Sequence, residues 1–216
     1  MIKFDPIKHS YIDDKGRKYK SVTTIINEIY PFNVNEIIAE IIVNPNSAYY
    51  QWTPAQVKRE WRQSAIEGSR VHKAIENFIN KNEFPKNIDI IPLVKQFKKL
   101  HFKGKLKTEL KVWDEDLLIA GTVDLLEDCG NYFWLWDLKT SKKLSDDRLI
   151  KFSMQLELYK RLVEKKFKKS VKIGGIIFFE NYVKLRKNTK ISIFPVLNCT
   201  KAINNIISNR KKELKI

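Results

Sequence analysis

Two ionisable residues of opposite charge stand one residue apart in the segment WLWDLKTSKK, residues 134–143. The apolar residues at its start predict a β-strand that runs into a core. In a strand, Asp137 and Lys139 occupy positions i and i+2, so both side chains point to the same face. A carboxylate and an ammonium directed into one small volume can act on the same bound group. This strand is therefore the starting point for a candidate site.

A second acid, Asp124, lies in AGTVDLL near the end of the preceding predicted strand, and the turn EDCGN joins the two strands. If the strands are antiparallel neighbours, this hairpin brings the carboxylates of Asp124 and Asp137 close together. Two carboxylates in one site repel each other unless a cation lies between them, and oxygen ligands favour Mg²⁺ or Mn²⁺ over zinc. The pattern predicts a metal site. The alternative is that each acid forms its own surface salt bridge.

Other side chains are expected near the same point. Lys139, beside a metal-bound Asp137, could stabilise charge on a phosphate or orient an attacking water. Glu109, on the first of three consecutive predicted strands, is a third acid that could ligate directly or through water. His72 falls on the apolar face of an earlier helix, where it is either a ligand or an ordinary core histidine. Gln155 and Tyr159, at i and i+4 of a later helix, offer hydrogen bonds toward the same spot.

The elements that must position these residues follow from hydrophobic periodicity. A β-hairpin is expected around the turn at residues 13–18, then a short helix capped by Ser21 or Thr23, and Thr53 followed by Pro54 marks a further helix start. From there the helical stripe consists of Ala65, Gly68, His72, Ile75 and Ile79. A helix over 91–102 precedes strands over 106–113, 117–126 and 131–138. Ser145 is expected to cap a long helix, followed by strands over 171–180 and 191–195 and a helix over 200–213. The order predicts an α/β fold around a mixed sheet.

The charge of the chain points to a polyanionic partner. Lysine and arginine number 41 against 25 acidic residues, which gives a net charge of +16, and such an excess favours nucleic acid through counterion release. No stretch approaches the roughly 18–20 apolar residues of a transmembrane helix, and the N-terminus has no signal-peptide pattern. Cys129 and Cys199 have no zinc-binding spacing. A cytoplasmic location, bacterial or in a phage-infected host, is expected rather than a mitochondrial or nuclear one.

In their order along the chain, the segments GSRVHKAIE, TELKVW, GTVDLL, WDLKTSK and QLELY resemble the motifs of the PD-(D/E)xK nuclease superfamily, in particular its RecB-like exonuclease branch. They span residues 68–159. The resemblance implies a restriction-endonuclease-like fold and carries metal binding onto His72, Asp124, Asp137 and the carbonyl of Leu138. It carries catalysis onto Lys139, with Glu109, Gln155 and Tyr159 as further matching positions.

Two features separate this chain from other members of that branch. The iron–sulfur members need four cysteines, and this chain has two, so no cluster is expected. P-loop spacing is absent, so no helicase segment is expected either. The proline of the superfamily's name is missing, because Gly121 and Thr122 precede Asp124; this is ordinary for the branch. The chain looks like a stand-alone member of the phage or mitochondrial type.

The resemblance implies a single nuclease domain over residues 1–216, with an N-terminal hairpin and helical cap over 1–60, a core over 61–195 and a C-terminal helix over 196–216. The expected activity is metal-dependent exonuclease action on DNA ends or single strands, in replication, recombination or repair alongside other proteins of those processes. Bases could stack on Tyr49, Tyr50, Trp52 and Trp61, although ordinary packing is the alternative for each. The other functions considered are a structure-specific or nicking endonuclease and an inactive nucleic-acid-binding subunit.

Overall fold

The computed structural model describes residues 2–5, 10–141, 143–180 and 190–215. Within them, eight strands form one mixed sheet in the order β1-β2-β3-β5-β6-β7-β8, with β4 paired to β5. The mixed α/β architecture expected from the sequence is confirmed. The strands are β1 (Ile2–Asp5), β2 (Ser10–Asp13), β3 (Lys18–Ser21), β4 (Lys105–Asp114), β5 (Ile119–Asp128), β6 (Tyr132–Ser141), β7 (Ser170–Glu180) and β8 (Lys190–Phe194).

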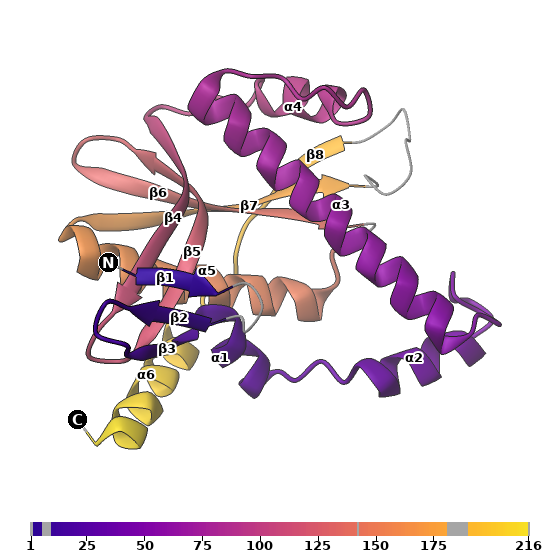
Figure 1. Cartoon of the computed structure of the whole chain (residues 1–216), viewed down its shortest axis with the longest axis horizontal. Coiled ribbons are helices and arrows are strands. Elements are labelled where there is room, and N and C mark those ends of the chain that lie inside the picture. Colours follow the sequence, from indigo (N-terminus) through magenta and orange to yellow (C-terminus); the bar gives the residue numbers. More distant parts are fainter. Residues whose placement is uncertain (1, 6–9, 142, 181–189, 216) are drawn as a thin grey trace.

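Helices cover both faces of the central strands (Figure 1). On one face, α3 and α4 pack with Leu125, Leu138 and Ile177 of β5, β6 and β7. On the other face, α1, α5 and α6 pack with a larger apolar cluster that includes Phe133 and Leu135 of β6. The helices are α1 (Val22–Ile29), α2 (Val34–Val43), α3 (Pro54–Lys81), α4 (Ile91–Phe97), α5 (Asp146–Phe167) and α6 (Thr200–Leu214). In the described residues, no helix is long and apolar enough to cross a membrane.

The N-terminal hairpin predicted around residues 13–18 is confirmed, since β2 and β3 pair as antiparallel strands across that turn. Ser21 caps α1 by accepting a hydrogen bond from the Thr24 N–H at 2.9 Å. Thr53 caps α3 in a reciprocal arrangement with Gln56, directly before Pro54. These starts were readable from the sequence because a cap depends on residues only a few positions apart.

Helix α3 is the longest helix among the described residues and crosses one face of the sheet (Figure 1). The helix lies very close to β6 at Gly68, where an added Cβ would come within 2.7 Å of the Thr140 Oγ1. The predicted apolar stripe holds only in part: Ala65 is exposed, Gly68, His72 and Ile79 are half-buried, and Ile75 is fully buried. The reason is that the N-terminal half of α3 projects beyond the sheet toward α2. The expected division at residues 60 and 61 falls inside this continuous helix.

Several element ends predicted from the sequence were wrong. Helix α4 ends at Phe97 rather than at residue 102. The strand β5 continues past Asp124 to Asp128, and β6 continues past Lys139 to Ser141, so these residues lie within strands rather than at their ends. The pairing of β6 with parallel β7 along its whole length provides the hydrogen bonds that extend it. Ser145 precedes α5 as expected, but its side chain makes no capping hydrogen bond.

One edge of β5 is shared by two partners. Antiparallel β4 pairs along the other edge from Ile119 to Asp128. The shared edge pairs first with parallel β3, at Ile119 and Ala120, and then with antiparallel β6, from Leu125 to Asp128. Between these two stretches β5 has no ladder partner on that edge among the described residues. Asp124 lies at this opening, which we call the fork.

Candidate active site

The fork brings together the two acids that the sequence singled out. The last backbone pair between β5 and β6 on this side is Leu125 with Trp136. One residue further along each strand are Asp124 and Asp137. Here the Leu138 N–H donates to the Asp124 Oδ2 at 3.0 Å instead of continuing the ladder. The predicted antiparallel pairing of these strands is confirmed, and a carboxylate occupies the place of a strand carbonyl.

Asp137 and Lys139 form a close pair on the face of β6 that α5 covers. The Lys139 Nζ donates to the Asp137 Oδ1 at 2.8 Å, and the two side chains are only 18% and 3% exposed. The same Nζ is 2.7 Å from the Asp137 Oδ2, yet this buried oxygen accepts no hydrogen bond of adequate geometry from any described residue. A buried carboxylate oxygen without a hydrogen-bond donor is costly. The atom is therefore available to a cation.

His72, Glu109 and Asp124 form a second group at the fork. One potential ligand atom from each of the three lies within 4.8 Å of the other two. The His72 Nδ1 is 3.8 Å from the Asp124 Oδ2, which is too long for a hydrogen bond but suits two atoms that flank a common ion. Close approach of α3 to β6 at Gly68 places His72 here, one helical turn further along α3.

Glu109 lies directly across from Asp124, because the pairs on either side are Thr108 with Leu125 and Leu110 with Val123. Its backbone has a φ of +52°, in the left-handed region. A non-glycine residue in that conformation costs on the order of 1–2 kcal/mol, and such residues concentrate at functional sites. The strained backbone interrupts the β4–β5 pairing at the one position where the carboxylate faces Asp124.

The pKa values of these groups follow from burial and mutual charge. Burial lowers the pKa of His72; the Asp124 carboxylate opposes this, the Lys139 charge adds to it, and the Leu138 carbonyl opposes it. The imidazole is neutral near pH 7, as a metal ligand must be. Loss of hydration raises the pKa of Glu109 to about 7, with the Asp124 and Glu76 charges adding to the effect and Lys73 opposing it.

The pKa values of Asp137 and Lys139 are both raised, for different reasons. Burial raises the pKa of Asp137, the Lys139 charge opposes this, and the Asp124 charge reinforces it. Burial disfavours the Lys139 charge, but Asp137 and Asp124 outweigh it, so the pKa of Lys139 is raised. Without a cation, the crowded carboxylates bind protons more tightly than isolated ones would.

Tyr159 reaches the fork from α5, and Gln155, one turn earlier on the same helix, forms a hydrogen bond with it. The Tyr159 ring packs against Gly121, where an added Cβ would lie 2.3 Å from its Cε1. Burial raises the pKa of Tyr159, the Asp124 and Tyr11 charges raise it further, and a hydrogen bond with Gln155 lowers it. The phenol therefore stays neutral and can donate. Gly121, three residues before Asp124, gives the ring its space.

Two further contacts at the site were not predicted from the sequence. The Tyr11 hydroxyl is 3.0 Å from the Thr122 Oγ1, so the N-terminal hairpin supports the segment that carries Asp124. Arg148 lies against Phe152, which also contacts Lys139. No spacing in the sequence links Tyr11 with Thr122, because 111 residues separate them. The sequence contains one signal for Arg148, because it is a cation in the first turn of a helix, where acidic residues are favoured.

The donor set fits a hard divalent cation. His72, Glu109 and Asp124 lie within reach of one ion, and Asp137 supplies the buried oxygen that accepts no hydrogen bond from the described residues. Carboxylates with one imidazole suit Mg²⁺ or Mn²⁺. The Leu138 carbonyl accepts a hydrogen bond from the His72 ring. Of the predicted metal-binding residues, His72 and Asp124 belong to the group with Glu109, whereas Asp137 lies outside that group, beside Asp124.

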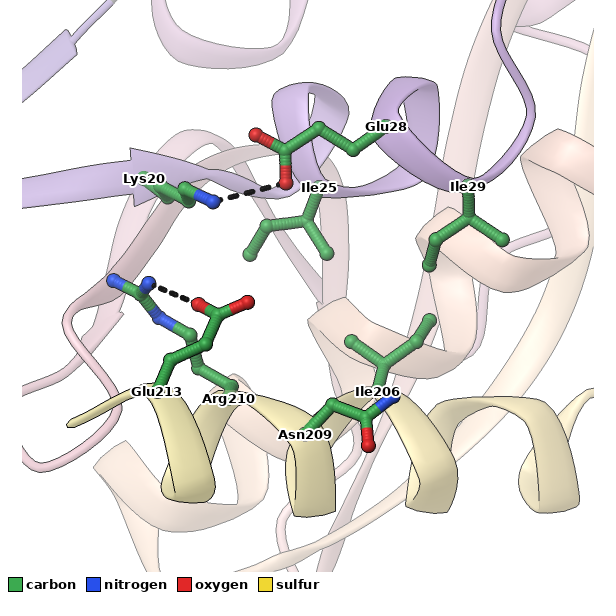
Figure 2. A pocket seen from close by; sticks show the side chains of 8 residues that line it. All are labelled: Lys20, Ile25, Glu28, Ile29, Ile206, Asn209, Arg210 and Glu213. Carbon is green, nitrogen blue, oxygen red and sulfur yellow. Dashed lines mark hydrogen bonds and ion pairs between the residues drawn. The ribbon is translucent and has the colours of Figure 1, made fainter. Parts of the chain in front are cut away.

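Two cavities lie away from the fork. One, of about 220 Å³, is bounded by α1 and α6 (Figure 2). Its charged side chains pair with each other, Lys20 with Glu28 at 2.9 Å and Arg210 with Glu213 at 2.8 Å. The other, of about 440 Å³, lies near the end of α3 and the start of β4. Neither contains the acids of the fork.

Three of the four aromatic residues considered for base stacking, Tyr49, Trp52 and Trp61, form a cluster with Phe32 near the start of α3, and the fourth, Tyr50, is exposed. Trp61 lies 5.7 Å from Phe32 and 6.4 Å from Tyr49, and Tyr49 lies 5.4 Å from Trp52, all between ring centroids. These rings pack against each other, and Phe32 is 52% exposed. Lys151 of α5 lies 5.7 Å from the Phe32 ring. The stacking role of the cluster stays a prediction.

Comparison with known proteins gives one family. The sequence profile described as "PD-(D/E)XK nuclease superfamily" matches residues 93–210, more than half of the chain. No curated protein sequence matches. Among solved structures, one titled "Crystal structure of SSO0001" has a TM-score of 0.40 and 16% identity, over 89% of this chain and 76% of that chain.

Proposed function

The chain belongs to the PD-(D/E)XK nuclease superfamily, and from this premise we propose that it is a Mg²⁺- or Mn²⁺-dependent DNA exonuclease. It would hydrolyse phosphodiester bonds from DNA ends and favour single strands, in the manner of the RecB-like branch. Superfamily membership indicates a nuclease that uses divalent metals and acts on nucleic acid. The preference for ends, the choice of DNA and a role in replication, recombination or repair are parts of the proposal.

The observation that carries the proposal is the pair of carboxylates at the fork, with Lys139 beside one of them. In the proposed site Asp124, Asp137, His72 and the Leu138 carbonyl hold the metal, and Glu109 ligates directly or through water. A divalent metal held there supplies a water of lowered pKa and neutralises charge on the phosphate. Asp137 serves both as ligand and as the group that keeps Lys139 charged.

The protein's own groups have defined tasks in this reaction. Lys139, whose pKa is raised, stays protonated and donates to a phosphate oxygen as negative charge develops. His72, whose pKa is lowered by burial, offers a neutral ring nitrogen. Tyr159 and Gln155 hold the segment around Gly121 in place and donate toward the fork. The half-buried position of Lys139 limits its motion, so its ammonium is already in place before the substrate binds.

The net charge supports a nucleic-acid substrate of either kind, and one aromatic surface supports a single-stranded one. The net charge of +16 attracts a polyanion without regard to sequence. The exposed Phe32 ring, next to Trp61 and under the Lys151 ammonium, combines a stacking surface with a phosphate-binding charge. Unpaired bases can stack on such a surface, whereas bases inside a duplex cannot.

The test is cleavage of end-labelled linear and circular DNA, single- and double-stranded, with Mg²⁺, Mn²⁺ or EDTA. We expect laddering from an end of linear single strands with either metal, no cleavage of circles, and no cleavage in EDTA. Cut circles would replace the exonuclease with an endonuclease that uses the same site. Binding without cleavage in any metal would identify an inactive binding subunit.

A further inference from the structure

Arg148 extends the row of polar side chains that begins at the metal-binding acid. Asp137, Lys139 and Ser141 alternate along β6 and share one face of it. At the end of this row the Arg148 NH1 donates to the Ser141 Oγ at 2.6 Å and, less closely, to the Lys143 carbonyl at 3.4 Å. The first turn of α5 thus places a guanidinium in line with Asp137 and Lys139. Arg148 is near these two residues in sequence but is not part of the D-x-K motif.

Arg148 and Lys139 share one aromatic ring. The Lys139 Nζ is 4.8 Å from the Phe152 centroid, and the Arg148 Cζ is 5.5 Å from it. Lys139 has Asp137 as its counter-ion, whereas Arg148 has none among the described residues, so its charge beside Lys139 is unfavourable. An anion between or beside them would remove that cost.

Arg148 has no carboxylate partner among the described residues. Both of its hydrogen bonds to them use NH1 and end on neutral oxygens. Asp146 and Asp147, its neighbours in sequence, are exposed and form no ion pair with it in the described part of the chain. Burial lowers the pKa of Arg148, but a guanidinium remains charged at any pH near neutrality. Half-buried arginines usually have an anionic partner, and the Nε and Nη2 donors of Arg148 make no hydrogen bond within the described part of the chain.

We propose that Arg148 binds a backbone phosphate of the DNA strand next to the phosphate that is cut. This inference rests on the proposed function and adds a substrate-binding residue to the site. A guanidinium presents two donors in a fixed plane that matches two phosphate oxygens, whereas an ammonium acts as a point charge. Ser141 and Phe152 hold that plane beside Lys139. Lys139 then acts at the cut phosphate, and Arg148 sets which linkage of the strand lies there.

A purely structural role is the competing explanation. In that case Arg148 would serve only to attach Ser141 and Lys143 to α5. The Ser141→Ala variant removes one of its two hydrogen-bond acceptors without changing charge. A structural tie predicts that Ser141→Ala and Arg148→Met lower the melting temperature alike and alter no particular phosphate contact. A phosphate-binding role predicts an effect that depends on the position of one phosphate.

The first measurement is binding of a short single-stranded oligonucleotide in Ca²⁺, by fluorescence anisotropy. Arg148→Met should weaken binding about tenfold, which is typical for loss of a charge-assisted bidentate contact. Arg148→Lys should recover part of the affinity, because it keeps the charge without the planar fork. Lys160→Met removes the same charge from the same helix, three turns away, and should weaken binding less than twofold.

The second measurement identifies the phosphate. Oligonucleotides carrying one neutral methylphosphonate at successive positions are cut in Mg²⁺ or Mn²⁺, and the rate at each linkage is read on a gel. The cut linkage sets the register, so the distance from the methylphosphonate to the cut is known. Apart from the cut linkage itself, where the metal and Lys139 are proposed to act, one fixed offset should slow wild-type cleavage about tenfold more than the others do. In Arg148→Met, a methylphosphonate at that offset should have no further effect.

The outcomes separate the two proposals. If the wild type cuts DNA and Arg148→Met shows the same offset pattern, or weakens binding no more than Lys160→Met, the Arg148 assignment is overturned and the exonuclease proposal stands. A wild type that neither binds nor cuts DNA overturns both. Loss of the single offset in Arg148→Met, with a melting temperature close to that of the wild type, supports the assignment.

Discussion

The Asp124 Oδ2 accepts a hydrogen bond from the Leu138 N–H at 3.0 Å, at the point where β5 and β6 stop pairing. A side chain on one strand is thereby fixed by the backbone of the strand that carries Asp137 and Lys139. A shift of β6 relative to β5 would therefore disturb the positions of both Asp124 and Asp137. This link couples the geometry of the proposed metal site to the pairing of the sheet.

Replacement of Asp137 by alanine should abolish cleavage and leave the fold intact. Removal of the carboxylate leaves Lys139 without its anion, which costs stability, but it breaks none of the strand pairing of β6 with β7. Cleavage of single-stranded DNA and the far-UV circular dichroism spectrum are the measurements. Asp128→Asn is the matched control: this acid lies at the other end of β5, where it pairs with Lys107 and Lys169, and its variant should cut normally. Full activity of Asp137→Ala in Mg²⁺ would remove Asp137 from the metal site.

Replacement of Lys139 by alanine should lower turnover much more than DNA affinity. Its charge at the cut phosphate is worth roughly 2–4 kcal/mol in the transition state, whereas one cation among 41 basic residues adds little to overall attraction. Single-turnover rates and binding in Ca²⁺ separate the two effects. Lys172→Ala, whose ammonium lies over the Tyr132 ring, is the control and should change neither. Weak binding with normal cleavage at saturation would make Lys139 a docking residue only.

Glu109 should destabilise the metal-free protein as the pH rises. Its pKa is about 7 in the folded chain against an ordinary 4.5, chiefly because burial disfavours its charge. Between these values the folded state keeps a proton that the unfolded state releases, so the free energy of unfolding falls as pH increases through this window. In EDTA, Glu109→Gln and the wild type should have the same melting temperature near pH 4.5. Above pH 7, Glu109→Gln should melt at the higher temperature. Mg²⁺ or Mn²⁺ should reduce the difference, and a difference independent of pH would contradict the assignment.

Gly121→Ala should destabilise the protein by about 1–3 kcal/mol, the usual cost of overpacking. The added Cβ would lie 2.3 Å from the Tyr159 Cε1, and both residues belong to buried elements that cannot separate freely. Urea unfolding of Gly121→Ala, Tyr159→Leu and the double variant forms a double-mutant cycle. The double variant should be more stable than the sum of the single effects predicts. Simple additivity would show that the two residues do not meet.

DNA binding in Ca²⁺ should weaken steeply with salt and depend little on sequence. If the chain neutralises about 4–6 phosphates of a single strand, the slope of log K against log salt should be roughly −3 to −4. Aromatic stacking at Phe32 and Trp61 would accept any base. Homopolymeric and mixed oligonucleotides across a salt series provide the measurement. A flat response, or a strong preference for one short sequence, would point to a sequence-specific enzyme instead.

Local patterns were enough to predict most elements and the central motif. The Thr53 cap, the hairpin around residues 13–18 and the pairing of the strands around EDCGN depend on residues close together in the chain. The i, i+2 spacing of Asp137 and Lys139 determines that both share one face of β6, and the structure has them paired. Strand alternation and helix capping depend on residues only a few positions apart, so both can be predicted from short segments of the sequence.

The strand ends and the shape of the site depended on long-range packing. The length of β6 comes from its parallel pairing with β7, and the fork exists because β3, about 100 residues earlier in the chain, takes part of the edge of β5. The left-handed backbone of Glu109 has no local signal in its sequence, since most residues avoid that conformation.

The contacts that complete the site are also tertiary. Gly68 against Thr140, Gly121 against Tyr159, and Arg148 beside Lys139 each join residues from different elements. The sequence by itself determined which chemical groups this protein has and which of them share a strand face or a helix turn. Only the tertiary structure decided which of them lie within bonding distance across elements, because that distance depends on how helices pack on the sheet and which strands pair.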